Sequence, residues 1–235
     1  MKKFAFGLTG NQLKMIALVS MTIDHIGYML YPDLLILRTL GRLAFPIFAY
    51  MIAEGCCYTR SMPRYFVTLA LCGAVCQAVY LVSLRSLYMC IFVTFGMSVG
   101  LIWLAKLAQT KRSLWWYAAF FAAVLAAYFL AEVLPYLLPK HWDYGIDYGF
   151  IGIVLPVCVY LCKKEWQRLL ACGILLVFLA LCNPTISYLW YALLSLPLLA
   201  LYNGKRGKWK LKWFFYIYYP AHLVALWAIL LWQLR

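Results

Sequence analysis

The sequence is poor in charged residues. They make up 12% of its 235 residues, whereas a soluble domain has about a quarter. Hydrophobic residues make up 67% of the chain, which leaves no stretch suited to a soluble domain. The sequence also lacks the segments of about ten residues with alternating polarity that build a membrane β-barrel. These absences predict an all-α fold, a polytopic helical bundle in a membrane.

Other common signals are missing as well. The basic and then apolar N-terminal segment is not followed by a small-residue cleavage site, so we expect a retained first helix rather than a signal peptide. The nine cysteines are scattered through apolar runs, and no spacing matches a zinc site. We therefore expect buried apolar cysteines and no metal. No internal repeat of the transporter type is visible, so residues 1–235 are expected to form a single membrane domain.

The apolar runs predict nine membrane-spanning helices. A helix crosses the hydrocarbon core, which is about 30 Å thick, with roughly 20 residues. The connections are short, which favours antiparallel packing of consecutive helices. The predicted spans are residues 12–31, 41–59, 64–84, 87–106, 114–133, 148–162, 167–182, 185–202 and 213–233.

Lysine and arginine residues in the connections predict the orientation. With the N-terminus in the cytoplasm, sixteen of them lie on the cytoplasmic side and four on the outer side, with Arg42 at a helix entrance. We therefore expect a multi-pass protein of the cell (inner) membrane, with a C-terminus that can be reached from outside. This bias and contact with anionic lipid explain the net charge of +14, so the expected partner is the lipid bilayer and not nucleic acid.

An ionisable pair, Asp24 and His25, interrupts the first apolar run. An aspartate in the middle of a membrane helix costs about 3 kcal/mol, and such residues are usually functional. Adjacent helical residues point about 100° apart, so Asp24 is expected to hold Arg42 or another helix rather than orient His25. The alternative interpretation is a structural pair.

The predicted topology brings five ionisable residues to one level in the outer half of the membrane. A proton-transfer site needs several ionisable side chains at one level of the membrane. Among polar neighbours, a histidine can act as a general base. The five residues are Asp24, His25, Arg42, Asp147 and His222.

Arg42 and His222 each stand close to a proline that bends a helix, Pro46 and Pro220. Arg42 either clamps a carbonyl or phosphate oxygen or reaches the interface as a snorkelling side chain. Tyr218 and Tyr219 either supply a hydroxyl group to the site or belong to the interfacial aromatic belt, and the belt is favoured for one of them.

Segments spread over nearly the whole chain carry a resemblance to a known family, and they keep their order. They are Leu13–Ala17 through Asp24–Gly27, Gly41–Phe48 with Glu54-Gly55 and Thr59-Arg60, Phe92–Gly96, Asp147–Gly149 with Gly152, Leu201–Gly207 and Phe215–Leu223. Through them the chain resembles the TraX family of membrane acetyltransferases, within the transmembrane acyltransferase superfamily. Cys90 stands where this family usually has an asparagine.

The resemblance implies an acyl-CoA-dependent acetyltransferase with a single transmembrane acyltransferase-like domain. It implies transfer of an acetyl group from cytoplasmic acetyl-CoA to an acceptor amine or hydroxyl at the outer side. It also implies His25 as the catalytic histidine, with Asp24, Arg42 and His222 as site members. The acceptor is expected to be a pilin, another peptide or a glycan, and the resemblance does not choose among them.

Basic residues on the cytoplasmic side are expected to attract the phosphates of acetyl-CoA. These are Arg60, Arg64, Lys205 and Arg206. Lys205 and Arg206 belong to the basic run 203–212, for which a lipid-facing anchor is the alternative. The remaining residues expected at the substrate-binding site are Glu54, Asp147, Tyr148, Asn203 and Tyr219.

Two other functions fit the polar residues. A proton-coupled small-molecule transporter also uses intramembrane histidine, aspartate and arginine, although such transporters usually have repeats. In a structural membrane protein, the polar cluster would only lock the helices together.

Overall fold

The structure is a computed structural model that describes residues 7–209 and 211–233. Its contacts divide the chain into two compact units. The first unit combines the two ends of the chain, Met1–Met51 and Glu165–Arg235, and the second is Ile52–Lys164. The expected all-α architecture is confirmed, apart from two strands of two residues each.

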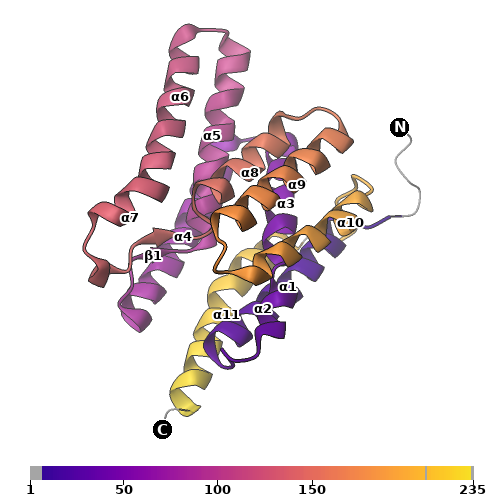
Figure 1. Ribbon diagram of the computed structural model, residues 1–235. Coiled ribbons are helices and arrows are strands. Elements are labelled where there is room, and N and C mark those ends of the chain that lie inside the picture. Colours follow the sequence, from indigo (N-terminus) through magenta and orange to yellow (C-terminus); the bar gives the residue numbers. More distant parts are fainter. Residues whose placement is uncertain (1–6, 210, 234–235) are drawn as a thin grey trace. The chain divides into compact units, whose positions relative to one another are not determined.

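The first unit is built from helices of both chain ends (Figure 1). They are α1 (Gly10–Met29), α2 (Leu35–Gly41), the beginning of α3 (Ala44–Tyr58), α9 (Glu165–Cys182), the 3-10 helix η3 (Ser187–Leu194), α10 (Ser195–Ala200) and α11 (Lys212–Gln233). A capping box starts α1, in which Thr9 and Gln12 satisfy each other's backbone N–H groups.

Helices α1 and α2 cross so closely that only glycine fits at the contact. A Cβ atom on Gly41 would collide with Asp24, and one on Gly27 would lie 2.7 Å from Leu37. The Ser20 hydroxyl donates a hydrogen bond to the Leu40 carbonyl across the crossing, at 2.6 Å. This short separation brings Asp24 within reach of the polar side chains of α2.

Helices α1 and α11 lie side by side and run in the same direction (Figure 1). The beginning of α1 meets the segment before α11, since the Asn11 side chain donates to the Trp209 carbonyl. Further along both helices, Thr22 meets Tyr218 and His25 meets His222. Later residues of α1 therefore contact later residues of α11, so the two helices are parallel.

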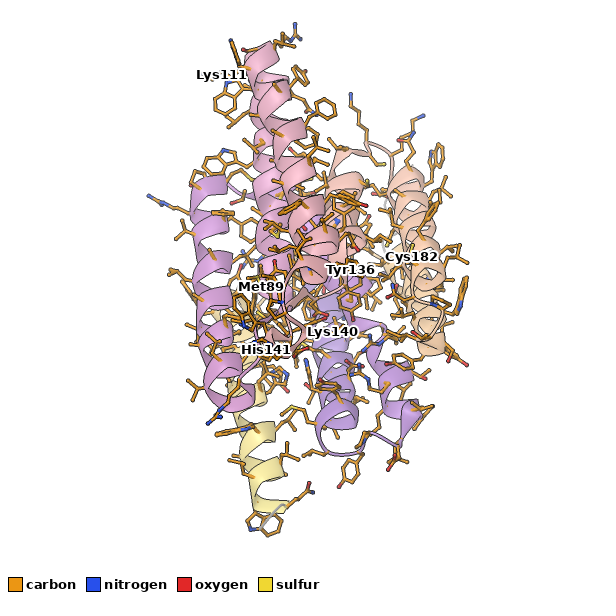
Figure 2. All side chains as sticks on the ribbon, turned by 60° about the vertical axis from the view of Figure 1, so that its left-hand side comes forward. Met89, Lys111, Tyr136, Lys140, His141 and Cys182 are labelled. Carbon is orange, nitrogen blue, oxygen red and sulfur yellow. The ribbon has the colours of Figure 1, made fainter. Side chains whose placement is uncertain are left out.

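The second unit contains the remaining elements. They are the end of α3, α4 (Met62–Leu84), β1 (Tyr88–Met89), α5 (Ile91–Lys111), α6 (Leu114–Tyr128), the π-helix η1 (Phe129–Val133), α7 (Leu134–Leu137), the 3-10 helix η2 (Lys140–Trp142), β2 (Gly145–Ile146) and α8 (Gly149–Leu161). Strands β1 and β2 pair in parallel. Lys111 lies at one end of this unit, and Met89, Lys140 and His141 lie toward the other (Figure 2).

Side-chain hydrogen bonds hold the apolar helices of the second unit in register. Ser98 of α5 donates to the carbonyl of Ile153 of α8 at 2.7 Å. The Glu132 carboxylate of η1 accepts from the backbone N–H of Phe150 at 2.8 Å, in the first turn of α8. A carboxylate at this place satisfies an N–H group that no helical carbonyl reaches.

The predicted count of nine spans is not supported. Among the described residues, six helices are long and apolar enough to cross a membrane, which makes the chain a multi-pass membrane protein. Helix α1 is not among them, since polar residues such as Lys14 and Asp24 reduce its hydropathy. Helix α8 has 13 residues, about 20 Å, and η3 with α10 is also short. The six are Leu35–Tyr58, Met62–Val82, Ile91–Lys111, Leu114–Leu137, Glu165–Cys182 and Trp213–Gln233.

The sequence predicts that residues 12–31 span the membrane, and the parallel packing of α1 and α11 then predicts that the two termini lie on opposite sides of it. A protease added to intact cells is expected to remove a C-terminal epitope tag and to spare an N-terminal one until the membrane is opened. Equal protection of both tags would contradict a crossing by both helices.

Candidate functional site

The histidines of α1 and α11 contact each other directly. His25 of α1 and His222 of α11 are hydrogen bonded through Nδ1 of His25 and Nε2 of His222, at 3.0 Å. The imidazole ring centroids are 4.9 Å apart. His222 is buried, and His25 keeps partial exposure. Residues separated by nearly the whole chain therefore form a histidine pair within the first unit.

The backbone of α11 fixes the tautomers of this pair. The second nitrogen of His222, Nδ1, lies 3.0 Å from the carbonyl oxygen of Tyr218. A carbonyl only accepts, so Nδ1 carries the proton, and Nε2 of the neutral ring must accept. His25 then donates its Nδ1–H to His222. The lone pair of His25 is left on Nε2, where it can accept a proton or attack an electrophile.

Two tyrosines of α11 hold the pair in place. The ring of Tyr218 stacks on His222 at 5.3 Å. Thr22 donates its hydroxyl to the Leu18 carbonyl, so the Tyr218 hydroxyl must donate to Thr22, at 2.9 Å. Tyr219 is buried and stands edge-on to both imidazoles. Sequence reasoning named both tyrosines as possible site or belt residues but included only Tyr219 among the predicted site residues, although the spacing of four residues between Tyr218 and His222 signals a shared helix face.

Asp24 belongs to a separate cluster, which it forms with two arginines. Its carboxylate forms ion pairs with Arg38, at 2.8 Å, and with Arg42. The expected contact between Asp24 and Arg42 is therefore present, whereas His25 has a different partner. The sequence analysis missed Arg38, which it counted only as a basic residue of the outer side. Its spacing of four residues from Arg42 is a signal that could have identified it.

The phenol ring of Tyr188, from η3, covers both guanidinium groups. Its centroid lies 5.6 Å from Arg38 and 5.3 Å from Arg42. Arg38 also lies over the ring of Tyr28, at 5.1 Å. Cation–π contacts of this kind offset part of the cost of keeping two guanidinium groups away from water. The result is a cluster of two arginines at α2 that is held against Asp24 of α1, the helix that carries His25.

Asp147 and Tyr148 belong to the second unit, so their expected level relative to His25 stays a prediction. The Asp147 carboxylate accepts a hydrogen bond from the Tyr88 hydroxyl at 3.4 Å. Burial raises the pKa of Tyr88, and the negative charge of Asp147 raises it further. The phenol therefore stays protonated and can donate. Tyr148 adopts a left-handed backbone conformation just before α8.

The basic run that begins at Asn203, called the basic segment below, is attached to the start of α1 in the first unit. The backbone N–H groups of Gly10 and Asn11 donate to the carbonyls of Lys205 and Arg206, at 2.8 and 2.9 Å. Asn203 is buried, and its side chain donates to the Gly7 carbonyl. The Lys205 and Arg206 side chains are exposed. Helix α1 separates them from His25 by about 20 Å, at 1.5 Å per residue.

A further cation of the first unit, Arg168 of α9, was not among the predicted site residues. Its guanidinium lies 5.4 Å from the ring of Tyr50, and Tyr50 contacts Tyr202 edge-on at 6.2 Å. Tyr202 directly precedes Asn203 in the basic segment. The predicted cations Arg60 and Arg64 are exposed in the second unit, and Glu54 is buried there.

Comparisons with known proteins point to one family. The model of the family described as "TraX protein" matches residues 9–230, which include most of both units. A segment of 38 residues is 55% identical to "Uncharacterized protein RP591" of Rickettsia prowazekii (strain Madrid E). That segment is 16% of this chain and spans 15% of the Rickettsia protein's length. No solved structure matches the chain.

Replacing Asp24 with alanine is expected to destabilise the protein more than replacing Arg38. Removal of Asp24 leaves two guanidinium groups without their shared carboxylate, which costs about 3–5 kcal/mol for a buried pair. In the Arg38→Ala variant, Asp24 retains Arg42. The free energy of unfolding in detergent micelles measures both effects. Asp33→Ala, an exposed site just after α1, is the control, and an equally small loss for Asp24→Ala would refute the role of the cluster.

Proposed function

The chain belongs to the TraX family, which implies acetyltransferase activity in general, and on that premise we propose that it is a membrane acetyltransferase dependent on acetyl-CoA. The donor is used from the cytoplasmic side, and the acetyl group passes to an amine or hydroxyl at the outer side. The observation that carries the proposal is the hydrogen bond between His25 and His222, with the tautomers set by the Tyr218 carbonyl.

His25 is the general base of the proposed reaction. Its Nε2 accepts a proton from the acceptor amine or hydroxyl while the acceptor's nitrogen or oxygen forms a bond to the thioester carbonyl carbon. The C–S bond then breaks, and His25 returns the proton to the leaving thiolate. The products are the acetylated acceptor and free CoA. His222 accepts the Nδ1–H hydrogen bond throughout, which stabilises the transient charge on His25.

The tetrahedral intermediate carries a negative oxygen that needs a hydrogen-bond donor. Arg42 is one candidate, because its guanidinium donates to the Asp24 carboxylate and its Nε–H donates to the Arg38 carbonyl, which hold its N–H groups in one plane. The Tyr219 hydroxyl is the other candidate, because its ring contacts both imidazoles. In this proposal Asp24 and Arg38 act as positioning residues that hold the Arg42 guanidinium in place.

Electrostatic attraction supports a donor site at the basic segment. Acetyl-CoA supplies an activated thioester and several phosphate groups. Lys205 and Arg206 are exposed, and Asn203 fixes the backbone between them and α1. Arg168 lies in the same unit and adds a cation, and Arg60 and Arg64 remain predicted contributors from the second unit. Because α1 begins at this segment and carries His25, one helix links the proposed binding and chemical sites.

A hydrogen-bonded histidine pair is also a proton relay, which keeps the transporter as a second candidate. Uptake of a solute into vesicles without covalent change would favour the transporter. Loss of an acetyl mass from surface peptides or glycans in cells that lack the protein would favour the enzyme. The proposed acceptors remain a pilin, another peptide or a glycan.

The two histidines are expected to differ in their catalytic effect. His25→Ala removes the general base and should lower kcat by about 10²–10⁴-fold. His222→Ala removes only the group that orients His25, so its loss of kcat should be smaller. His141→Ala, in η2, is the matched control and should retain wild-type turnover. Acetyl transfer by purified protein measures all three. Wild-type turnover in His25→Ala would exclude the mechanism.

The double variant Lys205→Gln/Arg206→Gln is expected to bind acetyl-CoA about 10²–10⁴-fold more weakly. Each charge-assisted hydrogen bond to a phosphate contributes about 1.5–3 kcal/mol, and 1.4 kcal/mol corresponds to tenfold in affinity. Isothermal titration calorimetry at two salt concentrations measures the effect, since salt should weaken the wild type more. The control is Lys163→Gln/Lys164→Gln, which removes the same charge from another exposed connection. Equal affinity of both double variants would place the phosphates elsewhere.

A further inference from the structure

Arg38, in the middle of α2, has one edge of its guanidinium group without a partner. Its Nη1 atom donates to the Asp24 carboxylate at 2.8 Å and to the Asp24 backbone carbonyl at 3.2 Å. The other two nitrogens, Nε and Nη2, have no hydrogen bond to any residue that the structure describes. Neither atom is among the buried polar atoms that lack a partner, and the Arg38 side chain is 16% exposed. This edge can therefore be reached from the surface of the first unit.

The positive charge of Arg38 is only partly compensated. Within the described part of the chain its acidic partner is Asp24, and Arg42 shares that carboxylate. The rings of Tyr28 and Tyr188 lie 5.1 and 5.6 Å from the guanidinium carbon. They restrain the planar group and surround it with a medium less polar than water. In such a medium a guanidinium attracts an anion more strongly than it does in bulk water.

The geometry of the open edge selects the chemistry of its ligand. The Nε–H group and one N–H group of Nη2 point in the same direction from the guanidinium plane. Their spacing matches two oxygens of one carboxylate or phosphate group, which an arginine binds through two parallel hydrogen bonds. A neutral hydroxyl or amide offers only one acceptor oxygen to this edge, and a cation would be repelled. The expected ligand is therefore an oxyanion.

The open edge lies close to the proposed general base. Arg38 is paired with Asp24, which directly precedes His25, and consecutive Cα atoms are about 3.8 Å apart. The positive charge of Arg38 also acts on the His25 imidazole. All of these side chains belong to the first unit, and the connection between α1 and α2 is expected on the outer side. A small acceptor from that side can place an acidic group on Arg38 while its amine or hydroxyl reaches His25.

We propose that Arg38 binds a carboxylate or phosphate group of the acceptor through paired hydrogen bonds from Nε and Nη2. This inference rests on the proposed acetyltransferase function and narrows its acceptor to an acidic amine or hydroxyl compound. The acidic group stays bound and unchanged, while the acceptor's nitrogen or oxygen forms the bond to the acetyl carbon. Nη1 remains on Asp24 throughout, so one side chain both positions the arginine cluster and selects the substrate.

Paired acceptors that differ in charge test the proposal with purified full-length protein and acetyl-CoA. Dialanine is compared with dialaninamide, and glycerol 1-phosphate with glycerol. In at least one pair the wild type should show a kcat/KM about tenfold or more higher for the acidic member. Arg38→Lys keeps a cation for Asp24 but loses the open edge, so the preference should fall below about twofold. Displacement of Arg42 alone would lower turnover of both members alike and leave their ratio unchanged.

The control and a second variant separate this role from a loss of folding. Arg85→Lys changes an exposed arginine just after α4, in the second unit, and should keep the preference of the wild type. Arg38→Gln, which removes the charge as well as the edge, replaces the lysine variant if that variant does not fold.

The melting temperature provides a measurement that needs no turnover. The background variant is Lys205→Gln/Arg206→Gln, which removes two cations of the basic segment. In this background, glutarate or inorganic phosphate at millimolar concentration should raise the melting temperature by about 2–4 °C relative to chloride at the same ionic strength. Addition of Arg38→Lys should abolish that rise.

Three results would contradict the proposal. Equal kcat/KM values within both pairs, in a wild type that transfers acetyl groups, would overturn this inference alone. Stabilisation through Arg38 by phosphatidylglycerol nanodiscs over phosphatidylcholine nanodiscs, without any effect of the soluble anions, would assign the edge to a lipid headgroup. A wild type that binds no acetyl-CoA and transfers no acetyl group would overturn the proposed function, and the acidic acceptor with it.

Discussion

The hydrogen bond between His25 and His222 is the contact on which the candidate site depends. It joins the first long helix of the chain to the last, and it needs α1 and α11 to run in parallel at a fixed register. Thr22 and Tyr218 set that register one turn earlier. The Tyr218 carbonyl then determines which nitrogen of each ring carries a proton. The packing of α1 against α11 therefore also determines the protonation of the two imidazole rings.

The crossing of α1 and α2 also supports this arrangement. Gly41 lets the two backbones approach until Asp24 lies against α2. Arg38 and Arg42 then share one carboxylate, and Tyr188 covers both guanidinium groups. Such a network is costly to break inside a membrane, because each charge would lose its partner. It restrains the rotation of α1, and with it the direction of His25.

Much of this site could be predicted from the sequence, since polar residues in apolar runs are few and must find one another. Sequence reasoning predicted a helical membrane protein and a contact of Asp24 with Arg42 or another helix. It did not reveal Arg38 or Tyr188, because arginine and tyrosine near a helix end usually signal the membrane interface. It also overestimated the number of spans, because short apolar helices such as α8 look like spans until their length is known.

The partner of His25 is a second histidine and not a carboxylate, which suits a reaction inside a bilayer. A permanently ionised partner would have to be desolvated in the resting protein, at a cost that only further charges could offset. Two imidazoles can both be neutral at rest, with one N–H shared between them. Charge then appears only while His25 holds the acceptor's proton. Asp24, which directly precedes His25 in the sequence, is already paired with two arginines. The fold thus separates the permanent charges that fix α1 from the transient charge that the proposed chemistry requires.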